Sequence, residues 1–233
     1  MSSSLQGTYA GAINTTYNAS PLWAQELTPT TKTRGLATWT RTKVLGSTNQ
    51  FLYAVTLFDE KLRPVQLQSI NASGGIDIQT TQYDFAGKVL VSHLRHQQGT
   101  GSTQQSYEVV SKPTYDVLGR VTRNEQKVGS GIWKTISEIE YDALGQAKTK
   151  KLAPDFVNGS GQPNGLETLT YDYIIRAWLL GMNRGYLTSD NNSRFGFELA
   201  YDKKKSAIDG GTADTYASAL YDGNIAGVGF GDV

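Results

Sequence analysis

Three aspartates in one recurring context are the residues of this chain that could carry catalytic chemistry. Asp84, Asp116 and Asp142 each follow a tyrosine and each stand three residues before a glycine. Paired carboxylates perform acid–base and nucleophilic steps in glycoside hydrolysis, so these residues define the enzyme hypothesis. They are 32 and 26 residues apart, however, and turn formation explains all three. We therefore expect structural aspartates, no catalytic residue and no enzyme.

The remaining chemistry-bearing residues do not form a recognisable site. His93 and His96 are the two histidines, and on a strand residues three apart point to opposite faces, so they are not expected to share a metal ion. The chain has no cysteine, which excludes disulfides and thiolate chemistry. No serine has a histidine base in a recognisable setting. We expect no metal and no cofactor.

The aspartates make sense as parts of a turn, most clearly between Thr114 and Thr122. A carboxylate at the first position of a type I turn accepts from the backbone N–H two residues on. Gly119 follows where the chain needs a positive φ, which completes the three-residue hairpin loop with a bulge. Arg120 then opens the return strand. We expect its side chain to pack over a tyrosine such as Tyr115, a cation–π contact of about 0.5–1 kcal/mol.

The turn recurs along the chain. An aromatic residue followed by aspartate begins at residues 58, 83, 115, 141, 171, 201 and 221, with steps of 25, 32, 26, 30, 30 and 20 residues. Hairpin tips are predicted near 59–63, 84–88, 116–120, 142–146 and 172–176. A loose period of this size is typical of repeat architectures in which each unit stacks on its neighbours.

These copies resemble the YD-repeat, or Rhs, family of large bacterial proteins, whose animal relatives include the teneurins. The resemblance covers roughly residues 35 to 230 and is strongest in the form found in Bacteroidetes-type members. Copy 171 has Ile175 in the glycine slot and keeps Arg176, and copies 201 and 221 keep only the Tyr-Asp pair. The residues that carry the repeat motif are Tyr83, Asp84, Gly87, Lys88, Tyr115, Asp116, Gly119, Arg120, Tyr141, Asp142, Gly145, Tyr171, Asp172 and Arg176.

The resemblance implies a function and a location. Family members build a hollow β-shell that encloses or displays a cargo polypeptide, often a toxin, and many end it with a self-cleaving region that carries an Asp-Pro-x-Gly motif. That motif is missing here, so autoproteolysis is not expected. The resemblance implies an extracellular or cell-surface place within a larger bacterial protein, although the N-terminal residues do not have the layout of a signal peptide.

Composition excludes further classes of partner. The formal net charge is +1 and charged residues make up 18% of the chain, so no global field favours nucleic acid. No apolar stretch reaches the roughly 18 residues that a membrane span requires. Twenty-five glycines and thirteen tyrosines fit a turn-rich β protein.

The elements that position these turns are strands with alternating polarity. We expect an irregular arm over 1–33 and a repeat sheet over 34–233, with a short helical or irregular insertion near 203–220. Trp39, Trp133 and Trp178 fall in predicted strands as wall packing, and Trp23 of the arm could plug a sheet edge. The predicted strands lie near 36–45, 51–58, 62–70, 76–83, 88–95, 105–115, 120–128, 132–141, 146–152, 166–173, 175–182 and 195–201.

Together these features predict an all-β fold of antiparallel hairpins in a curved, open sheet, a section of a YD-repeat β-shell. Such a sheet has open edges, which would pair with the remainder of a longer chain or with other copies. The predicted function is a non-catalytic wall around a cargo polypeptide. The alternative is a surface-binding module that recognises carbohydrate or protein through exposed aromatic side chains.

Overall fold

The computed structural model describes residues 24–157, 161, 165–187, 193–202, 216 and 219–230. Thirteen antiparallel strands in this part of the chain follow one another in one open sheet, each hydrogen-bonded to the next. The prediction of an all-β fold built from antiparallel hairpins is confirmed. The strands are β1 (Trp39–Lys43), β2 (Phe51–Phe58), β3 (Pro64–Ile70), β4 (Ile76–Tyr83), β5 (Val89–Gln98), β6 (Gln105–Tyr115), β7 (Val121–Val128), β8 (Lys134–Tyr141), β9 (Ala147–Leu152), β10 (Glu167–Tyr173), β11 (Leu179–Met182), β12 (Phe197–Ala200) and β13 (Gly227–Phe230).

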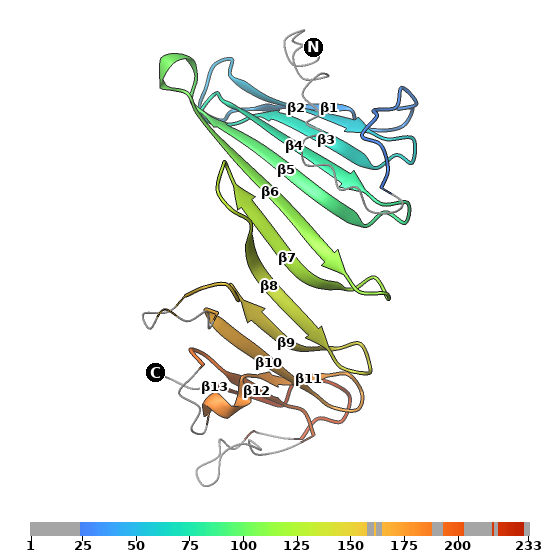
Figure 1. The fold of residues 1–233 in the computed structure, drawn as a ribbon, viewed down its shortest axis with the longest axis vertical. Helices are drawn as coiled ribbons and strands as arrows, with labels where there is room; N and C mark the ends of the chain where they lie inside the picture. The colour runs from blue at the N-terminus through green and yellow to red at the C-terminus, as the bar shows by residue number, and fades with distance from the viewer. Residues whose placement is uncertain are drawn as a thin grey trace. The chain divides into compact units, whose positions relative to one another are not determined.

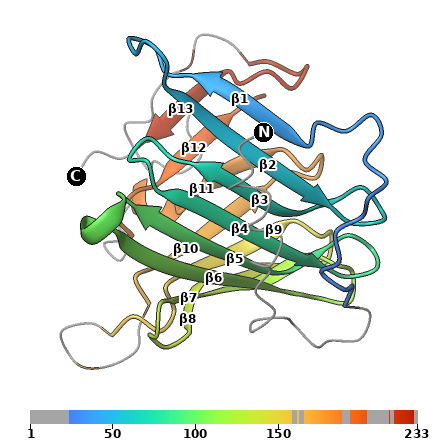
Figure 2. The same cartoon turned by 90° about the horizontal axis from the view of Figure 1, so that it is seen from above.

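The chain divides into two compact units, a division that the sequence did not indicate. The first comprises the residues up to Thr114 together with Asn124–Lys134, and the second comprises Tyr115–Arg123 together with the residues from Thr135 on. In the first unit β1 to β6 lie side by side in chain order, as Figures 1 and 2 show from two directions. In the second unit β8 to β13 likewise follow in chain order (Figure 1).

One face of the first unit holds its buried side chains, and these are both apolar and polar. The register of β2 to β6 puts Val55, Ile78, Val91 and Val110 on this face, and all four are buried. Buried polar residues alternate with them on the same strands. These are Gln66, Gln68, Thr80, Gln82 and His93.

Polar members of this face bond to one another along β3 and from β3 to β4, and Gln82 bonds to the segment before β1. Gln66 Nε2 donates to Thr80 Oγ1 at 3.1 Å, and Gln68 Nε2 donates to Gln66 Oε1. Gln82 Nε2 donates to the carbonyl oxygen of Gln25 at 3.2 Å. A buried amide without a partner would cost about 1–3 kcal/mol, so these bonds offset part of the cost of burying glutamine among valines.

The residues before β1 contribute a short backbone contact. Gln25 N–H donates to the Tyr83 carbonyl at 2.9 Å, and Ala24 forms an isolated antiparallel bridge with Asp84. The rest of 24–38 has no strand. The part of the predicted irregular arm before residue 24, with Trp23, lies outside the described residues, as does almost all of the predicted insertion at 203–220.

Three further predictions of elements need correction. The strand expected over 175–182 is shorter, because 174–178 forms a turn and β11 begins at Leu179. The sequence did not predict β13, whose four residues include two glycines. Trp178 therefore lies in a turn and Trp133 lies one residue before β8, whereas Trp39 is in β1 and 44% exposed. No helix in the described part of the chain is long and apolar enough to cross a membrane.

Candidate functional site

Four of the predicted turns share one backbone pattern. In each, the aspartate N–H donates to the carbonyl of the residue four positions on, and the N–H of the residue in the glycine slot donates back to the aspartate carbonyl. The four turns begin at Asp59, Asp84, Asp116 and Asp142. These aspartates therefore lie in hairpin tips, each bound within its own turn.

The aspartate side chain completes the turn. Asp116 Oδ1 accepts from the N–H groups of Leu118 and Arg120, both at 2.9 Å, and Asp116 Oδ2 accepts from Arg120 Nε at 2.7 Å. The hydrogen bonds and the charge of Arg120 hold the pKa of Asp116 below its ordinary value. Asp59 makes the same set of bonds with Lys61 and Arg63. In Asp116 and in Asp59, both carboxylate oxygens thus accept hydrogen bonds from residues of their own turn.

Acid should weaken the fold through these carboxylates. Burial alone would raise the pKa of Asp59, but its bonds from Arg63 and Lys61 and the charge of Arg63 outweigh burial and lower the pKa from 3.8. A depressed carboxylate pKa contributes stability above the unfolded value, and this stability is lost as the pH falls through the folded value. Urea unfolding from pH 6 to pH 2 should therefore show a fall that begins near pH 4 (about the unfolded pKa). The Asp59→Asn variant should show a shallower fall, and an equal slope would contradict this assignment.

Successive turns are tied to each other by arginine. Arg63 Nη1 donates to the carbonyl of Asp84, in the next tip, at 2.9 Å. Its guanidinium carbon lies 4.7 Å from the centre of the Tyr83 ring, and Tyr83 OH donates to the Pro64 carbonyl at 3.0 Å. One arginine therefore holds its own aspartate, the ring of the following tyrosine and the backbone of the following turn. We call this set of contacts the tip ladder.

The second unit repeats the ring contacts of the tip ladder. The guanidinium carbon of Arg120 lies 4.3 Å from the centre of the Tyr141 ring, and Tyr141 OH donates to the Val121 carbonyl at 2.8 Å. The expected cation–π contact is thus present, but its tyrosine is that of the following copy and not Tyr115, which ends β6. The sequence could not show this, because the choice of tyrosine depends on which turns lie side by side.

A double-mutant cycle should measure this contact. Replacing Arg120 by methionine and Tyr141 by leucine, singly and together, should give a coupling of about 0.5–1 kcal/mol in the free energy of unfolding. In a parallel cycle, Tyr141→Phe keeps the ring and removes only the hydrogen bond to Val121. The coupling to Arg120 should be close to zero in that cycle, because phenylalanine keeps the stacked ring. Additive effects with leucine would show that the stacking does not stabilise the fold.

Two turns place a residue with a side chain where the others have glycine. Leu62 has φ 62° and Ala177 has φ 66°, in the left-handed region, whereas Gly119 has φ 80° in the same slot. A side chain costs about 1–2 kcal/mol in this region. Leu62→Gly should therefore raise the free energy of unfolding by about 1 kcal/mol, since part of the gain is offset by glycine's greater entropy in the unfolded chain. Chemical denaturation measures this, and Leu118→Gly in the right-handed part of its turn should destabilise instead.

The fifth turn lies two residues later than predicted. Ile174 N–H donates to the Trp178 carbonyl and Ala177 N–H donates to the Ile174 carbonyl, which is the backbone pattern of the other four turns. The tip is therefore 174–178 and not 172–176. Tyr171 and Asp172 lie within β10, where Asp172 Oδ2 is 3.5 Å from Arg184 Nη1.

This correction changes what stands in each position of the fifth turn. Ile174 takes the aspartate slot and Trp178 takes the arginine slot. The ring of Trp178 lies 5.1 Å from that of Tyr201, the tyrosine of the following copy, at an angle of 44°. Tyr201 OH donates to the Leu179 carbonyl at 2.9 Å, the same bond that Tyr83 and Tyr141 make in their ladders. The tip ladder is thus continued here by two tilted rings in contact, without an ion pair.

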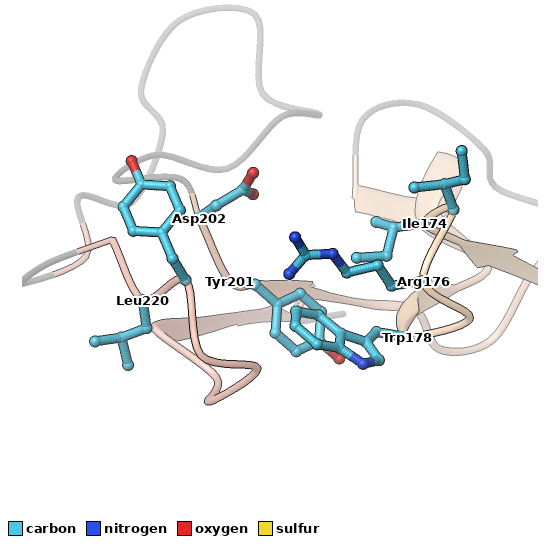
Figure 3. Close-up of a pocket in the computed structure, with 8 residues that line it drawn as sticks. Ile174, Arg176, Trp178, Tyr201, Asp202 and Leu220 are labelled. Atoms are coloured by element: carbon cyan, nitrogen blue, oxygen red, sulfur yellow. The ribbon is translucent and has the colours of Figure 1, made fainter.

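A pocket of about 250 Å³ opens beside these rings. In Figure 3, Arg176 extends from the fifth turn above Trp178 and Tyr201, and Asp202 lies across from it. The guanidinium carbon of Arg176 is 5.4 Å from the centre of the Trp178 ring. Within the described part of the chain, neither Arg176 nor Asp202 forms a hydrogen bond or an ion pair. The wall is completed by Ile174, Ile175, Leu220 and Tyr221.

A glycine fixes the position of the indole in this pocket. A Cβ at Gly223 would lie 2.9 Å from Trp178 Cζ2, and Gly223 has φ 92°. Both the close approach and the backbone conformation require glycine. Tyr221, two residues before Gly223, lines the pocket and is 74% exposed.

The two histidines lie on opposite faces of the first unit. His93 is buried, with Nε2 3.7 Å from Glu108 Oε2, whereas His96 Nδ1 is 2.6 Å from Asp77 Oδ1 on the other face. Among the described residues no cluster of three or more histidine or acidic side chains could hold a metal ion.

The structure brings some predicted residues together and separates others. The tip ladder brings Arg120 into contact with Asp116 and Tyr141. It also links the Asp59 turn to the Asp84 turn. Of the predicted set, only Arg176 lines the pocket. Trp178, Tyr201 and Asp202 were seen in the sequence but were not assigned to a site. Aligning Tyr173-Ile174 in the sequence with the Tyr-Asp pairs of the other turns would have placed Trp178 in the arginine slot, beside the tyrosine of the following copy. No family model matches the chain, and no curated protein matches it.

Proposed function

We propose that this chain is a non-catalytic wall section of a YD-repeat β-shell that encloses or displays a cargo polypeptide. The observation that carries the proposal is the tip ladder, in which Arg63 and Arg120 each bind the following copy as well as their own turn. A hairpin held in this way is completed by its successor. Stability then resides in the interfaces between neighbours, as in extended repeat proteins.

The buried face of the first unit also supports a wall. Gln66 and Gln68 are 1% exposed and rank among the largest fully buried side chains in the described residues. The bond from Gln66 to Thr80 links β3 to β4, and the bond from Gln68 to Gln66 runs along β3. A sheet that packs on a second layer buries mainly apolar side chains. The bond from Gln66 to Thr80 instead ties two neighbouring strands of the wall to each other.

The partners follow from the sheet and from the resemblance. We propose an extracellular or cell-surface position within a larger bacterial protein. The end strands β1 and β13 would pair with the remainder of such a chain or with other copies, since an edge strand offers unpaired N–H and C=O groups. The cargo would be a polypeptide, often a toxin in the family that the chain resembles.

Light scattering on a sizing column, across a wide concentration range, tests the proposal. A wall section should form defined oligomers whose population grows with concentration, because open strands pair between copies. A variant with a proline in the middle of β1, Arg41→Pro, should reduce that growth if the β1 edge is used, because proline distorts the strand and removes an N–H. A monomer at every concentration would overturn the wall proposal.

A second candidate is a surface-binding module that works through exposed aromatic side chains. The observation that favours it is the exposed ring of Tyr221 beside an aromatic pocket. Iodide quenching separates the candidates. A wall predicts tryptophans that are largely protected, whereas a binding surface predicts strong quenching that a ligand relieves.

A further inference from the structure

The two end strands of the sheet lie in segments of opposite charge. Residues 27–58, which contain β1, have four cationic residues and no acidic residue. Residues 206–233, which contain β13, have four aspartates and no cationic residue. Charge affects which edges can pair, because like charges directly opposite each other destabilise two neighbouring strands.

The open edge of β1 presents the backbone groups of alternate residues. Thr56 N–H donates to the Thr38 carbonyl and Val44 N–H donates to the Gln50 carbonyl, both at 2.9 Å. Bonded and non-bonded pairs alternate along an antiparallel ladder, so the even-numbered residues of β1 bond to β2. The N–H and C=O groups that point away from β2, to the open edge, are therefore those of Trp39, Arg41 and Lys43.

The cations at this edge have no acidic partner. All five residues of β1 are exposed, and Trp39 is 44% exposed. The Arg41 guanidinium carbon lies 3.5 Å from the centre of the Phe51 ring, and among the described residues neither Arg41 nor Lys43 forms an ion pair. The β1 edge therefore offers backbone donors and acceptors together with two cations and an exposed indole.

The open edge of β13 has the opposite character. Its two glycines lie against the Tyr216 side chain. Side chains alternate between the faces of a strand, so Val228 and Phe230 lie on the other face, where they are 47% and 63% exposed. Asp222, five residues before the strand, accepts from the backbone N–H and the side-chain amide of Asn224 and pairs with no cation in the described part of the chain. The β13 edge is therefore apolar and lies beside negative charge.

Three pairings between two copies of the chain use these edges. Pairing β1 with β1 would bring Arg41 and Lys43 close to the same cations of the other copy. Pairing β13 with β13 would bring two acidic segments together. Pairing β1 with β13 brings cations to an acidic segment and the Trp39 ring to exposed apolar side chains. Opposite charges and contacts of aromatic with aliphatic side chains both stabilise neighbouring strands.

We propose that the β1 edge of one copy of the chain binds the β13 edge of a second copy, so that the sheets join head to tail. The inference rests on the wall proposal and deepens it, because it assigns to each edge the edge that it binds. Such an interface is heterologous, so each assembly keeps one open β1 and one open β13 and grows into a longer array or closes into a ring. Salt should weaken the assembly, because ions screen charges that are exposed.

Two variants that each block one edge test the inference by light scattering on a sizing column. Arg41→Pro removes an N–H that points to the open edge and makes no bond to β2. Val228→Lys with Phe230→Lys places two cations on β13 at exposed positions. Each variant alone should stay monomeric at concentrations where the unmodified protein associates. An equimolar mixture of the two should form a one-to-one dimer and nothing larger, because only one compatible pair of edges remains.

A charge exchange tests the electrostatic part. Arg41→Glu with Lys43→Glu should raise the dissociation constant of the association at least about tenfold. Adding the two lysines of β13 to the same chain should restore the constant to within about threefold of its original value. Lys148→Glu changes an exposed lysine of the interior strand β9 and should alter the constant less than about twofold. Circular dichroism checks the fold of each variant, and the double glutamate variant serves as the β1-blocked partner if Arg41→Pro does not fold.

The outcomes separate this inference from the wall proposal. An unmodified protein that is monomeric at every concentration overturns both. Association of the unmodified protein together with association of either edge variant alone overturns only the inference, because it shows that like edges pair. A mixture of edge variants that stays monomeric, or a charge exchange that restores nothing, overturns the inference as well.

Discussion

Alanine at position 75 is expected to lower the free energy of unfolding by about 3 kcal/mol, because the strand beyond it leaves no room for a methyl group. A Cβ at Gly75 would lie 2.0 Å from the carbonyl oxygen of Gln97 and 2.7 Å from its carbonyl carbon. Both are backbone atoms, so no side chain can rotate away. The turn before β4 and the end of β5 would have to separate.

The separation would also break polar contacts around the turn. Asn71 Nδ2 donates to the same Gln97 carbonyl at 2.7 Å and to Asp77 Oδ1 at 3.0 Å. Urea denaturation of Gly75→Ala measures the loss. Gly46→Ala is the matched control, because Gly46 has φ 79° but nothing within 4 Å of a Cβ. That control should cost only the backbone strain of about 1 kcal/mol. Equal losses in the two variants would show that the close approach to Gln97 contributes nothing.

The local turn chemistry was predictable from sequence because it depends on residues within five positions. At Asp116 the sequence gives both the carboxylate and the glycine that must adopt a positive φ, and the structure has both bonds at 2.9 Å. The all-β antiparallel fold follows from the same pattern, since each turn reverses the chain. The prediction therefore held for the architecture, where local rules repeat.

Contacts between copies were not predictable in the same way. Arg120 stacks on Tyr141, 21 positions away in the chain, and no local rule chooses it over Tyr115. The buried hydrogen bonds of Gln66 and Gln68 were not predictable from the sequence either. Glutamine in an alternating strand reads as a solvent-facing residue, and only the register of β3 against β4 shows that its amide has buried partners.

The sequence prediction put the fifth turn two residues too early. The motif residues are Tyr171-Asp172, but the backbone bonds of the turn begin at Ile174, after Tyr173. A turn of this type tolerates isoleucine at its first position, since the backbone bonds do not need the carboxylate. It also tolerates Ala177 in the left-handed region at a cost of about 1–2 kcal/mol. Residue identity was a poor guide at the fifth turn, which has neither the aspartate nor the arginine of the ladder, and that turn carries the pocket.

Removal of the Asp59 carboxylate should destabilise the fold about as much as the Gly75 substitution. Asp59 is 6% exposed and accepts from the N–H groups of Lys61 and Arg63, while its Oδ2 holds the Arg63 guanidinium. Asp59→Ala should cost about 2–4 kcal/mol, because hydrogen bonds to a charged group contribute about 1.5–3 kcal/mol and the guanidinium loses its counter-charge. Thermal and urea unfolding give the value.

Asp84→Ala is the matched control, since it tests whether the ladder or the turn alone carries this energy. Asp84 Oδ1 accepts from the Lys88 N–H at 2.8 Å, while the tie from Arg63 reaches the Asp84 backbone carbonyl, which alanine retains. Asp84→Ala should therefore cost only about 1 kcal/mol. In the Asp59→Ala variant, by contrast, Arg63 loses the carboxylate that holds its guanidinium over the Tyr83 ring. A further change of Tyr83 to leucine should therefore lower the free energy of unfolding less than it does in the unmodified protein. If both aspartates cost the same and Tyr83→Leu is additive with Asp59→Ala, each turn is stabilised alone, and the argument that one hairpin is completed by the next loses its energetic basis.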